Sequence, residues 1–228
     1  MQRFFDICFS GLALLILSPL LVPIAIILRL TGEGEIFYLQ KRIGRGRRAF
    51  HLYKFVTMLK SSPSMGTGTV TVKDDPRILP VGMFLRKTKI NELPQLLNIL
   101  LGHMSVIGPR PLTKQTFGAY TKETQRAIEK VRPGLSGIGS IIFRGEEDIL
   151  AGANNSLDFY NNTIAPYKGS LETWYIANYT LANYFKAIIV TVIVVLLPNS
   201  QVAWNAFKGL PAPPQELKNL LNYSSMLR

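Results

Sequence analysis

The sequence feature that most constrains the fold is an apolar segment near the N-terminus, residues 4–30. Its 27 residues include a single acid, Asp6, and a single base, Arg29. A straight helix of this length is about 40 Å long, which exceeds the roughly 30 Å of a bilayer's hydrocarbon core. The apolar run is too long for a secretory signal, and no small-residue cleavage site closes it. We therefore expect a membrane helix.

Prolines interrupt this helix in its middle, at Ser18-Pro19 and at Pro23. Proline removes a backbone hydrogen bond, so a kink near Ser18 would leave two arms of about 18–21 Å, each too short to cross the bilayer core. The segment that follows is basic and belongs on the cytoplasmic side; its bases are Lys41, Arg42, Arg45, Arg47 and Arg48. We expect residues 1–30 to form a re-entrant membrane helix, and a kinked spanning helix is the alternative.

The remaining composition indicates the kind of partner. The 228 residues carry a formal charge of +12, which favours an anionic partner such as a phospholipid surface, a nucleotide or a nucleic acid. One cysteine, Cys8, and two histidines exclude a disulfide framework within the chain and a zinc cluster built from these residue types.

Residues 35–57 have the pattern of a β-hairpin. Two β-prone runs, residues 36–39 and 50–53, flank a turn that contains Gly44 and Gly46. The basic residues of this turn could bind RNA, but the adjacent membrane helix favours contact with anionic lipid head groups. A stretch rich in Ser, Gly and Thr, residues 61–71, then predicts a mobile loop.

The stretch 74–111 is crowded with basic residues, acids and turn formers. We expect a short helix to begin at Asn91-Glu92-Leu93-Pro94, to bury a stripe of leucines, and to end at Gly102. Glu92 would then lie at a positive helix end with several bases near it in sequence, namely Arg77, Arg86, Lys87, Lys89 and Arg110. This pattern fits a metal and phosphate site, and it also fits a capped core helix with a solvated basic face.

The C-terminal half offers weaker patterns. We expect a helix over residues 114–131, and either a second part of the site or an exposed helix start at 143–148, where Arg144 precedes three acids. Residues 174–197 predict either an interfacial helix or a buried core helix, and residues 198–228 predict a loose tail. The expected fold class is α+β, mostly helical with a small β-hairpin, a re-entrant N-terminal membrane helix and interfacial amphipathic helices. Residues 31–197 would form the catalytic domain.

Seven segments, in order along the chain, resemble the small monotopic phosphoglycosyl transferases, bacterial enzymes that start glycan assembly on a polyprenyl carrier. The segments are RFFDICFSGLALLILSPLLVP at 3–23, YKF at 53–55, KDDPRI at 73–78, FLRKT at 84–88, NELPQLLN at 91–98, MSVIGPRP at 104–111 and VRPGLSGIG at 131–139. The resemblance implies transfer of a sugar 1-phosphate from a nucleotide-diphosphate sugar to polyprenyl phosphate. It also implies a requirement for Mg²⁺ and a location at the cytoplasmic face of the bacterial inner membrane.

The resemblance also implies roles for particular residues. Glu92 matches a carboxylate that helps to hold the metal, and Asn91 stands where the family has its nucleophilic aspartate. The remaining matches are Lys54, Arg86 and Arg110 for phosphate binding and Ser18-Pro19 for the break in the membrane helix. Arg144 is a further candidate for substrate binding, which comes from the charge pattern at 143–148 and not from the resemblance. Val56 and His103 also depart from the family, which usually has Arg and often has Asp at these positions.

Asn91 leaves a second hypothesis open, because an amide is a poor nucleophile towards phosphorus. The chain would then be a catalytically impaired or engineered-inactive member of the family that acts as a binding or scaffold protein. A third hypothesis, a basic membrane-associated nucleic-acid binder, requires aromatic stacking platforms or a groove-binding helix, and the sequence shows neither. The expected partners are therefore a nucleotide-diphosphate sugar, polyprenyl phosphate and anionic phospholipid, with no nucleic acid; the oligomeric state is not predicted.

Overall fold

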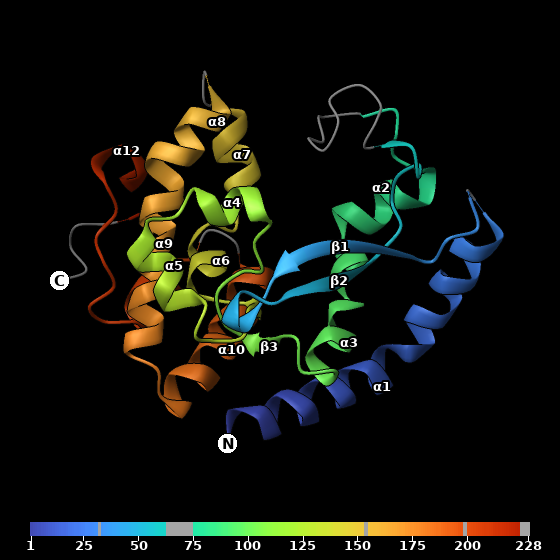
Figure 1. Cartoon of the computed structure of the whole chain (residues 1–228), viewed down its shortest axis with the longest axis horizontal. Coiled ribbons are helices and arrows are strands. Elements are labelled where there is room, and N and C mark those ends of the chain that lie inside the picture. Colours follow the sequence, from blue (N-terminus) through green and yellow to red (C-terminus); the bar gives the residue numbers. More distant parts are fainter. Residues whose placement is uncertain (32, 63–74, 153–154, 198–199, 224–228) are drawn as a thin grey trace. The chain divides into compact units, whose positions relative to one another are not determined.

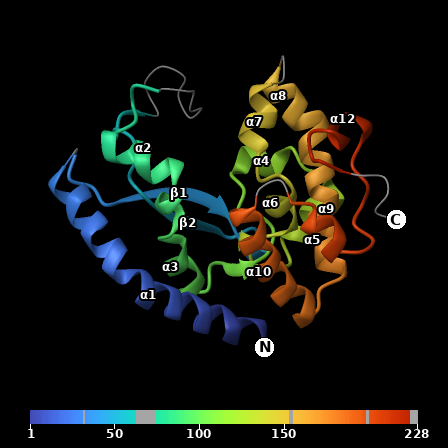
Figure 2. The same cartoon turned by 180° about the vertical axis from the view of Figure 1, so that it is seen from behind.

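The computed structural model describes residues 1–31, 33–62, 75–152, 155–197 and 200–223, shown from two sides in Figures 1 and 2. The described residues are mostly helical with a small antiparallel hairpin, which confirms the predicted fold class. They fall into two units. The first unit contains Met1–Asp6, Arg42–Phe50 and His103–Arg228, and the second contains Ile7–Lys41 and His51–Gly102. The functional division predicted at residues 30 and 197 stays a prediction.

The apolar N-terminal segment forms one helix, α1 (Gln2–Leu30), which is the one described helix long and apolar enough to cross a membrane. Pro19 has no N–H, so the carbonyl oxygen of Leu15 lacks its usual helical donor. The Ser18 hydroxyl donates a hydrogen bond to that oxygen at 2.8 Å and replaces the missing donor. The ribbon in Figures 1 and 2 bends along its length, but the helix is not divided into two separate arms. Re-entry itself stays a prediction.

The predicted hairpin is present as β1 (Phe37–Ile43) and β2 (Ala49–Phe55), joined by the 3-10 turn η1 (Arg45–Arg47). Gly46 has a φ of +66° in this turn, a left-handed conformation that glycine adopts without steric cost. Most of the predicted mobile loop lies outside the described residues, because the description stops at residue 62 and resumes at 75.

The second unit continues with α2 (Pro80–Lys87), the 3-10 turn η3 (Ile90–Glu92) and α3 (Gln95–Leu100). Its buried apolar core contains Ile24 and Leu28 of α1, together with Phe55 of β2 and Leu85 of α2. Gly82 allows α2 to approach the hairpin closely, because a Cβ at this position would lie 2.2 Å from the carbonyl oxygen of Thr57. The C-terminal half of α1 therefore forms one wall of this small core.

The predicted leucine stripe of α3 is only partly correct. Leu96 is buried, whereas Leu101 is 60 % exposed. The fully buried positions of the helix are instead Asn98 and Ile99. Gly102, with a φ of +85°, ends the helix as predicted.

In the first unit, two short strands form a parallel pair that the sequence analysis did not predict. Strand β3 (Ser105–Ile107) pairs with β4 (Gly134–Ser136), with Ser105 opposite Gly134 and Ile107 opposite Ser136. Gly134 is needed there, because a Cβ would lie 2.1 Å from the backbone nitrogen of Gly108. The pairing brings two of the seven resemblance segments, residues 104–111 and 131–139, side by side.

Helices form the rest of the first unit (Figure 1). They are α4 (Lys114–Gly118), α5 (Lys122–Ile128), α6 (Ile138–Ile142), α7 (Glu146–Ala151), α8 (Ser156–Phe159), the π-helical turn η4 (Tyr160–Ile164), α9 (Ala165–Ala177), α10 (Leu181–Leu196), α11 (Val202–Ala206) and α12 (Gln215–Lys218). The single helix predicted over residues 114–131 is wrong, because the chain breaks it after α4. Thr121 then caps the start of α5, its hydroxyl accepting a hydrogen bond from the backbone N–H of Thr124.

Helix α10 combines the two alternatives considered for its segment. One face is buried in the core of the first unit, with Tyr184 and Ala187 fully enclosed. The opposite face exposes apolar side chains, among them Ile189 and Val192, which suits a membrane interface. The prediction of a loose tail is wrong for residues 200–223, because Phe207 and Leu217 are buried in the same core.

Candidate active site

Two residues predicted for the site form an ion pair in the second unit. The Lys54 ammonium, on β2, lies 3.0 Å from Oε1 of Glu92, at the end of η3. Both side chains are partly exposed, 18 % for Lys54 and 25 % for Glu92, so the pair is accessible to a ligand. A cation and a carboxylate held together at the surface can contact a phosphate and a divalent cation, respectively.

Asn91 lies beside this pair and is almost buried, with 9 % of its surface exposed. Its side-chain oxygen has no hydrogen-bond partner among the described residues. A buried polar atom without a partner costs free energy, and such atoms often face a ligand or an ion. The Asn91 amide oxygen and the Glu92 carboxylate therefore provide two adjacent oxygen donors.

The local backbone differs from the predicted helix start. Asn91 and Glu92 belong to the 3-10 turn η3, and α3 begins later, at Gln95, with Pro94 just before it. Because α3 has only six residues, its dipole adds little to the local field. Lys89, which precedes η3, has a φ of +59°, an unusual conformation for a residue with a side chain. The position of Glu92 is therefore set by the 3-10 turn η3, and the dipole of α3 contributes little to the electric field at its carboxylate.

Helix α1 packs against the segments that carry this part of the site. Ile24 and Leu28 of α1 pack in one cluster with Phe55 and Leu85, the chain neighbours of Lys54 and Arg86. Ile90, the residue before Asn91, packs against the same cluster. The membrane helix thus fixes the three segments that carry Lys54, Arg86 and the Asn91-Glu92 pair.

Asn98, which the sequence analysis missed as a functional position, connects α3 to the strand that carries Lys54. Its amide nitrogen donates to the carbonyl oxygen of His51 at 2.8 Å, and its side-chain oxygen accepts from the backbone N–H of Tyr53 at 2.9 Å. The side chain is fully buried. The sequence contained a signal for this role, because Asn98 follows two leucines in the NELPQLLN segment. A polar side chain among the leucines of a core helix must find hydrogen-bond partners inside the protein.

The basic residues of the second unit have different environments. Arg77 is buried in a bidentate pair with Asp75, with Nε–Oδ1 and Nη2–Oδ2 distances of 2.8 and 2.6 Å, and this hydrogen bonding raises the pKa of Arg77. Arg77 therefore has a structural role. Arg86 is half-buried on α2, and its guanidinium lies 3.9 Å from the sulfur of Met58, which is a weak contact.

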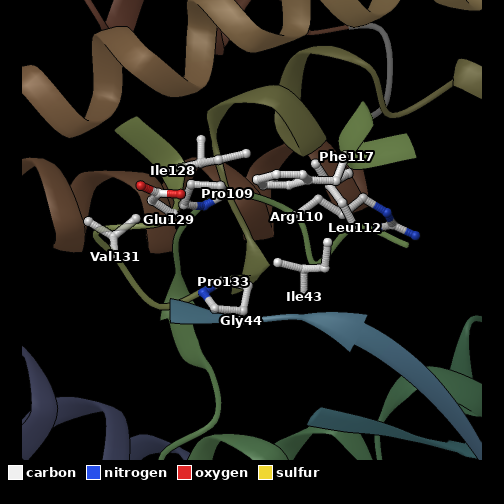
Figure 3. Close-up of a pocket in the computed structure, with 10 residues that line it drawn as sticks. All are labelled: Ile43, Gly44, Pro109, Arg110, Leu112, Phe117, Ile128, Glu129, Val131 and Pro133. Carbon is white, nitrogen blue, oxygen red and sulfur yellow. The ribbon is translucent and has the colours of Figure 1, made fainter. Parts of the chain in front are cut away.

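Arg110 belongs to the first unit, in the turn after β3. It lines a small cavity of about 20 Å³ together with Ile43, Gly44, Pro109, Leu112, Phe117, Ile128, Glu129, Val131 and Pro133. Figure 3 shows its guanidinium at the outer edge of this group of residues, and the side chain is exposed. Because Arg110 belongs to the first unit and Lys54 and Arg86 to the second, the shared role in phosphate binding expected for these three residues stays a prediction.

Arg144 lies in a different part of the first unit. Its guanidinium donates a hydrogen bond to the carbonyl oxygen of Val195 at 3.4 Å, near the end of α10. It also lines a cavity of about 380 Å³ together with Trp204 and Leu221 from the C-terminal segment. Glu146, two residues further on, pairs with Lys168 at 2.6 Å, so this acid is part of an ion pair and not only of an exposed helix start.

A buried polar cluster on α9 was not predicted from the sequence. Lys168 and Glu172, one helical turn apart, are 3 % and 2 % exposed. Burial raises the pKa of Glu172 to about 7, while Lys168 and the backbone N–H groups of Gly139 and Arg110 act in the opposite direction. Burial also lowers the pKa of Lys168, against the attraction of Glu146. The Glu172 carboxyl group lies against Gly139, where an added Cβ would come within 2.5 Å of its Oε1.

The comparisons with known proteins agree with these features. The family model described as bacterial sugar transferase matches residues 1–198. The chain is 33 % identical over 199 residues to the exopolysaccharide production protein PSS of Rhizobium leguminosarum bv. phaseoli, covering 85 % of this chain and 94 % of that protein.

Two longer relatives match over part of their length. The UDP-glucose:undecaprenyl-phosphate glucose-1-phosphate transferase of Escherichia coli K12 is 35 % identical over 166 residues, which cover 70 % of this chain and 35 % of that enzyme. The UDP-N-acetylgalactosamine-undecaprenyl-phosphate N-acetylgalactosaminephosphotransferase of Aeromonas hydrophila is 36 % identical over 143 residues, or 62 % of this chain and 34 % of that enzyme. This chain therefore spans about a third of each of these two transferases. With a family match over 198 of its 228 residues, the chain belongs to the bacterial sugar transferase family.

Proposed function

We propose that this membrane-associated sugar-phosphate transferase moves a sugar 1-phosphate from a nucleotide-diphosphate sugar to polyprenyl phosphate. A phosphate oxygen of the lipid forms a bond to the sugar-bearing phosphorus, and the phosphoanhydride bond to the nucleoside monophosphate breaks. The products are a polyprenyl-diphosphate sugar and a nucleoside monophosphate. The reaction takes place at the cytoplasmic face of the bacterial inner membrane, as the first membrane step of glycan assembly.

The observation that carries this proposal is the Lys54–Glu92 ion pair beside the buried oxygen of Asn91. The elements that hold these residues pack against α1, the long apolar helix. A lipid phosphate acceptor requires an active site at head-group height, which a site supported directly by a membrane helix can provide. The names of the relatives that act on UDP-sugars and undecaprenyl phosphate support the same substrates.

The donor atoms also fit Mg²⁺. This ion prefers oxygen ligands and is commonly held by one or two carboxylates and the substrate's phosphates. The described residues contain no cluster of three His, Cys, Asp or Glu side chains, so the substrate would have to complete the coordination. Glu92 and the amide oxygen of Asn91 would hold the ion, which would neutralise charge as the phosphoanhydride bond breaks.

The basic side chains have separate tasks in this proposal. Lys54, oriented by Glu92, binds the diphosphate together with Arg86 and Arg110, and Arg144 is a candidate for contact with the rest of the donor. Fixed cations stabilise the negative charge that develops on the leaving nucleotide phosphate in the transition state, and they do so more strongly when water is excluded from the site.

Asn91 favours a second candidate, a family member that binds its donor but reacts poorly. A carboxylate at this position can form an acyl-phosphate intermediate, whereas an amide is neutral and a poor nucleophile. The chain should therefore bind nucleotide sugar and form little covalent phospho-sugar adduct. Turnover would then depend on Glu92 or on direct attack by the lipid phosphate.

The experiment compares Asn91→Asp, Glu92→Gln and the control Glu123→Gln, which removes an exposed acid of α5. Radiolabelled nucleotide sugar and polyprenyl phosphate in detergent report both turnover and trapped adduct. Asn91→Asp should increase the adduct by several orders of magnitude, the scale on which loss of a nucleophile affects other enzymes. Glu92→Gln should abolish activity in either background, and Glu123→Gln should have no effect. If Asn91→Asp changes nothing and Glu92→Gln is harmless, the site lies elsewhere.

A further inference from the structure

A cavity of about 300 Å³ opens in the first unit. It is bounded by the first turns of α1, the hairpin turn, the parallel strand pair and the end of α9. The residues that line it are Gln2, Arg3, Asp6, Arg45, Ser105, Ile107, Gly108, Pro109, Lys130, Val131, Arg132, Tyr175, Ile176 and Tyr179. Neither Glu92 nor any of the basic residues proposed to bind substrate is among them.

The lining of this cavity is strongly basic. Four of its residues are bases, Arg3, Arg45, Lys130 and Arg132, against a single acid, Asp6. The Asp6 carboxylate is buried and is engaged by protein groups: its Oδ1 accepts hydrogen bonds from the Ser105 hydroxyl, the Val106 N–H and the Tyr184 hydroxyl. The positive charge of the cavity therefore exceeds its negative charge, and Oδ1 of the acid is already engaged by protein donors.

The position of the cavity along α1 indicates its height relative to a membrane. Arg3 lines the cavity, and the next residue, Phe4, is 66 % exposed and begins the apolar surface of the helix. Tyr179, two residues after α9, also lines the cavity and is exposed, and tyrosine is favoured at membrane–water interfaces. A cavity at the junction of apolar and basic surface lies at the level of lipid phosphates.

We propose that this cavity binds the phosphate group of an anionic membrane phospholipid. Arg45, Lys130 and Arg132 supply charge-assisted hydrogen bonds to the phosphate oxygens. The Tyr175 ring lines the cavity, and its hydroxyl, in a side chain only 3 % exposed, has no hydrogen-bond partner among the described residues. The inference rests on membrane association of α1 and is independent of the transfer chemistry.

The test compares two pairs of substitutions that remove the same charges from exposed positions. Arg45→Gln with Lys130→Gln changes the cavity, and Lys122→Gln with Arg126→Gln changes α5 away from it. The full chain in neutral detergent is titrated with short-chain phosphatidylglycerol, short-chain phosphatidylcholine or inorganic phosphate, and native mass spectrometry measures bound ligand. Transfer activity is measured separately on the same preparations.

The unaltered chain should bind phosphatidylglycerol in preference to the zwitterionic lipid and to inorganic phosphate. The cavity pair should weaken this binding about fivefold for each charge removed, whereas the α5 pair should not weaken it. Equal weakening by both pairs would show only diffuse charge attraction and would overturn the proposal. Binding of inorganic phosphate as strong as that of phosphatidylglycerol would also overturn it, because the site would then recognise free phosphate. Absence of transfer activity in the unaltered chain, with its lipid binding intact, would contradict the proposed function and not this inference.

Discussion

The Ser18 hydroxyl donates a hydrogen bond to the carbonyl oxygen of Leu15, the oxygen that Pro19 deprives of its helical donor. A serine placed directly before a proline can thus maintain a helix through a position where proline alone would leave a carbonyl unsatisfied. In the low dielectric of a membrane an unsatisfied carbonyl is costly, so this pair lets α1 bend without losing a hydrogen bond at Leu15.

The first prediction concerns topology. Pro19→Leu with Pro23→Leu restores two backbone donors and should straighten α1, so that the helix spans the bilayer and its N-terminal end moves to the outer side. A cysteine added before Met1, in a Cys8→Ser background, is tested in intact cells with a membrane-impermeant thiol reagent. The chain with its prolines should be protected and the Leu variant labelled. Labelling of the proline-containing chain would rule out the re-entrant helix.

Gly82 gives a second prediction, about how α2 is positioned. Gly82→Ala would place a Cβ 2.2 Å from the Thr57 carbonyl oxygen, and relief of this overlap should cost about 1–3 kcal/mol of stability and displace Arg86. Gly118→Ala in α4 is the control, because nothing lies within 4 Å of its Cβ position. Thermal unfolding in detergent and the KM for nucleotide sugar are the measurements. Similar melting temperatures for the two variants would contradict the close approach.

A third prediction follows from the buried carboxyl group of Glu172. Burial raises its pKa from 4.5 to about 7, so the folded state favours the protonated form. This contribution to stability is complete below about pH 4.5 and is lost as the pH rises through about 7, by up to about 3 kcal/mol. Glu172→Gln should flatten this part of the pH–stability curve, measured by thermal unfolding, while Glu123→Gln should leave it unchanged. An identical pH dependence in all three proteins would show that Glu172 titrates normally.

The C-terminal segment provides a fourth prediction. Leu217 is fully buried against the core of the first unit, whereas Leu220, three residues later, is 49 % exposed. Leu217→Ala should therefore cost about 2–5 kcal/mol, and Leu220→Ala much less. Denaturant unfolding in detergent compares the two. If both variants were as stable as the wild type, residues 200–223 would not belong to the folded core.

Local patterns predicted much of the second unit. The length and composition of residues 4–30 are sufficient to predict α1, and the glycines between two β-prone runs are sufficient to predict the hairpin. The exact start of α3 was not predictable, because Pro94 fits the first turn of an α-helix as well as the residue before it. The 3-10 turn that holds Asn91 and Glu92 contacts α2, a packing that the local sequence pattern does not reveal.

Contacts between distant residues were the part that the sequence did not reveal. The β3–β4 pair joins three-residue strands about thirty positions apart, too short to give an alternating pattern. Glu172 fits against Gly139, whose missing side chain leaves space for the carboxyl group, and neither residue alone indicates the other. Arg110 in the candidate site is a further case. It belongs to a different unit from Glu92, so no local sequence pattern predicts the distance between the two residues.

The hydrogen bond between Tyr184 and Asp6 has a consequence for the order of events during synthesis. The two residues are 178 positions apart, and the other donors to Asp6, Ser105 and Val106, also follow long after it. On the ribosome, Asp6 is made 99 residues before Ser105 and 178 residues before Tyr184, so these donors become available to it in two steps. The first turn of α1 therefore gains its hydrogen bonds to β3 well before the one to α10, and its attachment to the first unit is complete only once Tyr184 has been made.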